Sequence, residues 1–98
     1  MESERISEFV REMLSDCNEN KAENNLIIRQ ATGKPEGEHL TCADIIGHII
    51  NTKDATVYLS GLKILVLLLF GGKKNIEDNS IQIVAKLIKE GFEKNLLS

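Results

Sequence analysis

The sequence predicts an all-α protein: a single domain, residues 1–98, with four to five helices packed around a buried central helix at about residues 54–70. Three observations support this fold class. Residues 55–70 are apolar on every face and carry one charge, at Lys63, and such an element is covered by its neighbours on all sides. Three other segments repeat apolar residues at helical spacing. A chain of 98 residues can also build one core without disulfides or metal.

In the central segment, length and residue type favour a helix over a strand. The segment is longer than a usual strand, and Leu outnumbers the β-branched residues in its second half. The pair Gly71-Gly72 then provides a stop. The uninterrupted apolar run at 64–70 is far shorter than the roughly 20 residues needed to span a bilayer. We therefore expect no contact with a membrane.

The first helix is predicted from about residue 3 to residue 17. Its apolar residues follow the i, i+3, i+4, i+7, i+8 pattern and form one stripe: Ile6, Phe9, Val10, Met13 and Leu14. The next segment, 18–25, contains four Asn and no apolar residue larger than Ala. Asn competes with helix formation through its own hydrogen bonds, which predicts a polar linker at 18–25.

Residues 26–31 contain a short apolar run in which helix and strand cannot be separated by period. We prefer a short helix. The alternative is a β-hairpin that pairs 26–31 with 39–42. Both interpretations place a loop at 32–39, because this segment holds the only Pro between two Gly.

The start of the next helix carries the most specific local signal. Thr41 and Asp44 have the spacing of a capping box, and Leu40 with Ile45 has the spacing of a hydrophobic staple. An apolar stripe follows to about residue 50. The polar connection at 52–54 offers caps for the central helix and is so short that the two helices must be neighbours.

The last helix is predicted to begin at Asn79, which with Gln82 forms a second possible capping pair. Its apolar stripe runs to Phe92. Gly91 should weaken this helix by roughly 1 kcal/mol relative to Ala, so that its end frays or bends. Leu96 and Leu97 form a short apolar tail.

No catalytic or metal-binding pattern is apparent. His39, His48, Cys17 and Cys42 are the only residues of their types. Cys42 and His48 lie six positions apart, which does not place them on one helix face. We therefore predict no enzymatic activity, no metal and no cofactor.

Composition limits the kinds of partner and the cellular compartment that we expect. The net charge is −3, the pI is about 5.4, there is no Trp and aromatic residues are few, all of which disfavours a nucleic-acid partner. Two cysteines are too few for a disulfide scaffold, and the acidic start does not resemble a signal peptide. These features predict an intracellular protein of the cytoplasm or nucleus.

The apolar stripes exceed what the burial of one central helix requires, and a large exposed apolar patch usually marks a protein–protein contact. We therefore predict a protein-binding adaptor or scaffold module that acts through apolar helix faces, with self-association as a homodimer the first expectation. The predicted partner-binding residues lie on the end helices: Phe9, Met13, Phe92 and Leu96.

An alternative function is a small dimeric nucleic-acid-associated regulator. It would use the lysines of the C-terminal third: Lys73, Lys74, Lys86 and Lys89. Phosphate binding weakens steeply as salt rises, whereas apolar association does not. The salt dependence of binding affinity therefore distinguishes the two functions.

Overall fold

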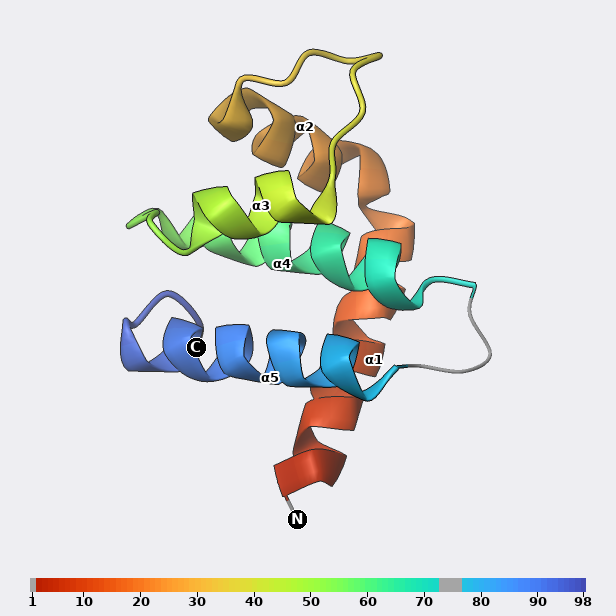
Figure 1. Ribbon diagram of the computed structural model, residues 1–98, viewed down its shortest axis with the longest axis vertical. Helices are drawn as coiled ribbons and strands as arrows, with labels where there is room; N and C mark the ends of the chain where they lie inside the picture. Colours follow the sequence, from red (N-terminus) through yellow and green to blue (C-terminus); the bar gives the residue numbers. More distant parts are fainter. Residues whose placement is uncertain (1, 73–76) are drawn as a thin grey trace.

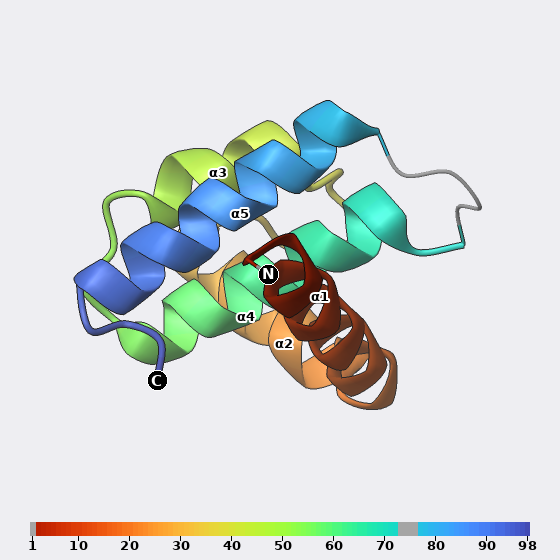
Figure 2. The same cartoon turned by 90° about the horizontal axis from the view of Figure 1, so that it is seen from below.

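The computed structural model describes residues 2–72 and 77–98. These residues form five α-helices and no strand: α1 (Glu2–Glu19), α2 (Lys21–Thr32), α3 (Cys42–Ile49), α4 (Ala55–Phe70) and α5 (Asp78–Glu93). Helices α3, α4 and α5 lie roughly alongside one another, and α1 crosses them at a steep angle (Figures 1 and 2). The predicted all-α bundle is therefore confirmed. Lys73, Lys74 and Ile76 lie outside the described residues.

Helix α4 is the centre of the bundle, because it contacts each of the other four helices. It begins after Asp54, whose side chain accepts hydrogen bonds from the backbone N–H groups of Thr56 and Val57. Its lone charge, Lys63, forms an ion pair with Asp16 of α1. Hydrogen bonding to Lys63 lowers the pKa of Asp16 below its ordinary value. The ion pair therefore ties α1 to the central helix.

Helices α2 and α3 approach the backbone of α4 at Gly61, which is buried. A Cβ atom at this position would lie 2.5 Å from Ile49 Cγ2 and 3.1 Å from Ile28 Cδ1. Real Cβ atoms essentially never come as close as the first of these contacts. The absence of a side chain at Gly61 therefore allows the close packing of three helices.

The capping box predicted at Thr41 and Asp44 is confirmed. The Asp44 backbone N–H donates to Thr41 Oγ1, and the Thr41 backbone N–H donates to Asp44 Oδ2, both at 3.0 Å. The hydrogen bond from the Thr41 backbone is the main reason that the pKa of Asp44 is lowered. The start of α3 is thus set by interactions local in the sequence.

The prediction of a polar linker at 18–25 is wrong. Helix α1 continues to Glu19 and α2 begins at Lys21, so that only Asn20 separates them. The physical reason is at Asn24, which is buried and whose Oδ1 accepts a hydrogen bond of 3.1 Å from Ser60 Oγ of α4. A polar partner on α4 therefore lets this asparagine-rich segment pack as a helix.

The hairpin alternative for 26–31 and 39–42 is also wrong, because residues 26–31 belong to α2. Helix α2 ends at Thr32, followed by Gly33 in a left-handed conformation with φ of 73°. The chain is then non-helical as far as Thr41. This segment is close to the predicted loop at 32–39.

Helix α5 begins slightly earlier than predicted. It begins at Asp78, one residue before the predicted cap at Asn79, and no side chain caps it. At the other end it continues past Gly91 to Glu93. Gly91 is buried, and a Cβ there would lie 2.6 Å from Leu97 Cδ1 and 2.7 Å from Tyr58 Cε1. The glycine therefore allows the C-terminal tail to fold back onto the helix.

Tyr58 links α4 to α5 inside the core. Its side chain is fully buried, and its hydroxyl donates a hydrogen bond of 2.5 Å to the Leu87 carbonyl. Burial raises the pKa of Tyr58 above its ordinary value of 10.0, and the nearby charge of Glu90 adds to this shift. The core thus favours the neutral phenol.

We expect Gly61→Ala to lower the free energy of unfolding by about 1–3 kcal/mol, because the added methyl overpacks the contact with the stiff, buried Ile49. Gly47→Ala in α3 is the matched control, since nothing lies within 4 Å of a Cβ at that exposed position. That control should gain up to about 1 kcal/mol from helix propensity. Urea unfolding of both variants measures the difference, and equal stabilities would contradict the packing at Gly61.

We expect Tyr58→Phe to lower the free energy of unfolding by about 0.5–1.5 kcal/mol at neutral pH, because the bond to Leu87 is lost. The raised pKa adds a pH dependence. The folded state keeps the phenol proton to higher pH than the unfolded state, so this contribution is fully present below pH 10.0 and is lost as pH rises through the folded pKa.

Unfolding curves at neutral and alkaline pH test this expectation. Tyr58 is the only tyrosine in the chain, and the difference between wild type and Tyr58→Phe isolates its contribution from those of all other groups. An alkaline loss of stability of the same size in both proteins would contradict the role given to the hydroxyl.

Candidate functional site

A groove of about 550 Å³ lies between α1 and α5. We call it the α1/α5 groove. Its lining is apolar at the centre and charged at the rim, and consists of Arg5, Ile6, Phe9, Ala85, Ile88, Lys89, Phe92 and Glu93. This arrangement of an apolar centre with a polar rim is typical of protein-binding surfaces.

Phe9 and Phe92 form the aromatic contact of the groove. Their ring centroids are 6.0 Å apart and the ring planes meet at 68°, an edge-to-face geometry. Phe92 nevertheless remains 44% exposed. The pair therefore offers a rigid apolar anchor to a partner.

Helix α1 leaves one side of the groove open. Its N-terminal turns extend beyond α5, away from the rest of the bundle (Figure 1). Ile6 and Phe9, in the N-terminal half of α1, are only partly buried. The apolar stripe predicted for α1 is therefore not fully covered at its N-terminal end.

The structure brings three of the four predicted binding residues together around Phe9. Phe92 is its ring partner, and Leu96 lies in an adjoining recess of about 240 Å³ that Phe9 also lines. Met13 does not belong to this surface. It is 4% exposed and part of the core, because the stripe of α1 is covered one turn further along the helix. Met13 is therefore left out of the binding surface that we propose below.

The sequence interpretation missed the residues that surround the two phenylalanines. Ile6 precedes Phe9 by three positions, and Ile88 precedes Phe92 by four. Such neighbours share a helix face. Applying this spacing to each phenylalanine would have identified the apolar residues of the groove. No pattern in the sequence identifies the charged residues at its rim.

The residues considered for catalysis differ in their exposure. Cys17 is fully buried and its pKa is raised by burial, whereas Cys42 is half-buried and His39 exposed. Both thiols are free. Within residues 2–72 and 77–98, no three His, Cys, Asp or Glu side chains are grouped so that they could hold a metal ion.

The lysines of the alternative function are only partly described. Lys86 and Lys89 are exposed on α5, and Lys89 lies at the rim of the α1/α5 groove. Lys73 and Lys74 lie outside the described residues. Of the four lysines predicted for this function, the structure therefore describes two, both on α5.

Comparison of the chain with protein-family models, with curated proteins and with solved structures finds no match. In the part of the chain that the structure describes, no helix combines the length and the apolar character needed to cross a membrane.

We expect Met13→Ala to lower the free energy of unfolding by about 2–5 kcal/mol, because it leaves a cavity in the core. Phe92→Ala should cost only about 1 kcal/mol, mainly the edge-to-face contact with Phe9. Urea unfolding with circular dichroism measures both. If Phe92→Ala proved as destabilising as Met13→Ala, Phe92 would be a core residue and not part of an interaction surface.

Proposed function

We propose that this chain is a non-enzymatic protein–protein interaction module, of adaptor or scaffold type, that binds a helix of another chain in the α1/α5 groove. The observation that supports this proposal best is the exposed Phe92 paired with Phe9 above an apolar floor. Amphipathic helices bind in apolar grooves of this kind through residues at i, i+3, i+4 and i+7.

The aromatic pair provides most of the expected binding energy. In interfaces, a few aromatic or Arg side chains in a desolvated pocket dominate affinity, and the surrounding polar contacts exclude water. Phe9 and Phe92 are already held edge to face. A partner therefore gains apolar contact without the entropy cost of ordering a mobile anchor.

A second copy of the chain is the first partner we propose. The rim carries both signs, with Arg5 and Lys89 as cations and Glu93 as an anion. In a two-fold dimer the same surface of both copies forms the interface, and a contact from one residue to another occurs twice. The cations of one rim can therefore lie near the carboxylate of the other rim. Such a mixed rim complements itself, which a rim of a single sign does not.

The proposal is tested by light scattering on the purified chain over a dilution series. The matched variants are Phe92→Ser and Ile83→Ser, because the two side chains are 44% and 42% exposed on the same helix. They lie on opposite faces of α5, since nine residues correspond to two and a half turns, and Ile83 does not line the groove.

We expect wild type and Ile83→Ser to form a dimer that dissociates on dilution, and Phe92→Ser to weaken the dimer by about tenfold or more. A monomer at every concentration would contradict the homodimer. The groove would then have to bind a different protein, and this protein should bind to Ile83→Ser but not to Phe92→Ser. Equal binding by both variants would contradict the use of the groove.

A further inference from the structure

A larger pocket, of about 920 Å³, lies between α2 and the loop that follows it. It shares no lining residue with the α1/α5 groove. Leu26 contributes an apolar surface and is 57% exposed, more than any other large apolar side chain described. The other lining residues relevant to its chemistry are Lys21, Arg29, Lys34, Pro35 and Glu36.

The loop wall of this pocket is held in place by Arg29. Its Nη1 donates hydrogen bonds to the carbonyl oxygens of Pro35, at 2.9 Å, and Glu38, at 2.8 Å. The Lys34 backbone N–H also donates to the Arg29 carbonyl, at 3.0 Å. These three hydrogen bonds fix the loop that forms the pocket wall to α2. A pocket whose walls are already ordered loses little entropy when a ligand binds.

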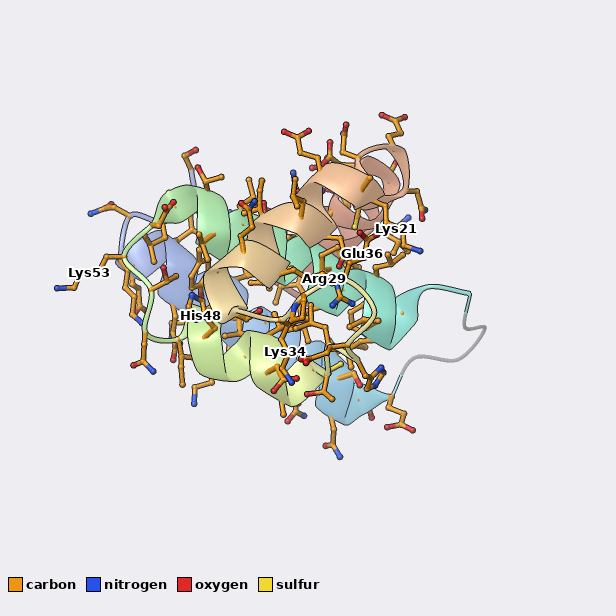
Figure 3. All side chains as sticks on the ribbon, turned by 90° about the horizontal axis from the view of Figure 1, so that it is seen from above. Lys21, Arg29, Lys34, Glu36, His48 and Lys53 are labelled. Atoms are coloured by element: carbon orange, nitrogen blue, oxygen red, sulfur yellow. The ribbon has the colours of Figure 1, made fainter. Side chains whose placement is uncertain are left out.

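The charges around the pocket are mainly positive. Lys21, Arg29 and Lys34 face one carboxylate, that of Glu36, in a chain whose net charge is −3. Lys34 is partly neutralised by Asp44, whose Oδ2 lies 3.7 Å from Lys34 Nζ. Lys21 and Arg29 then outnumber the single carboxylate of Glu36. Figure 3 shows Lys21, Arg29 and Glu36 at one part of the surface, far from Lys53.

We propose that this pocket binds a small amphipathic organic anion, with a carboxylate near Lys21 and Arg29 and an aliphatic chain against Leu26 and Pro35. Its volume falls within the range of about 300–1,000 Å³ common for small-molecule sites. The apolar surface selects for a ligand with an aliphatic body, and the cations select for a negative head. This site is independent of the proposed protein interaction at the α1/α5 groove.

The test is a titration of the isotopically labelled full chain with octanoate, followed by amide NMR shifts. Acetate has the carboxylate without the long aliphatic part, and octanol has the aliphatic part without the charge. The site variants are Lys21→Gln and Leu26→Ser, which change exposed side chains. Lys53→Gln is the control, because Lys53 is an exposed lysine outside the pocket.

We expect saturable shifts in α2 and at residues 33–38. Octanoate should bind more tightly than acetate and octanol, and Lys21→Gln and Leu26→Ser should each weaken it about three- to fivefold, the size expected for one partly exposed contact. Lys53→Gln should bind as wild type does. The proposal is overturned if octanoate gives no saturable shifts, if the shifts lie elsewhere, or if the site variants bind as the control does while retaining their helicity.

Discussion

The burial of α4 on every side is the constraint on which the rest of the structure depends. A helix that is apolar all round must be covered completely, and each of the other four helices packs on it. Gly61 brings α2 and α3 close on one side, and Asp16 neutralises Lys63 at the edge that faces α1. Because α1 and α5 are both positioned by α4, the groove between them follows from how two helices pack on one partner.

The parts of the fold that could be predicted depend on residues close together in the sequence. The all-round apolar character of residues 55–70 and the box of Thr41 and Asp44 are visible without tertiary information. The error at 18–25 and the packing at Gly91 depend instead on residues that are distant in the sequence. Asn24 is helical and buried because Ser60, 36 positions away, supplies its partner. Gly91 is required by Leu97 and Tyr58, and local propensity contains neither contact.

The same distinction applies to the candidate site. Phe9 and Met13 belong to one apolar stripe, and the sequence offers no means to separate them, since only the position at which α1 crosses the bundle decides that Met13 is covered. Phe9 and Phe92 could be selected as aromatic residues on end helices, but their edge-to-face contact arises from tertiary packing. Likewise, Arg29 contributes to a pocket only because its guanidinium reaches two carbonyls of the following loop.

The complete burial of Cys17 in α1 has a consequence for the dynamics of the molecule. A thiol-specific reagent can reach Cys42, which is half-buried, without any rearrangement, but it can reach Cys17 only when α1 separates from the core. Because burial also disfavours its reactive thiolate form, modification of Cys17 reports almost purely on this opening. The rate at which Cys17 is modified therefore measures the local undocking of α1, which supplies three of the eight residues that line the α1/α5 groove.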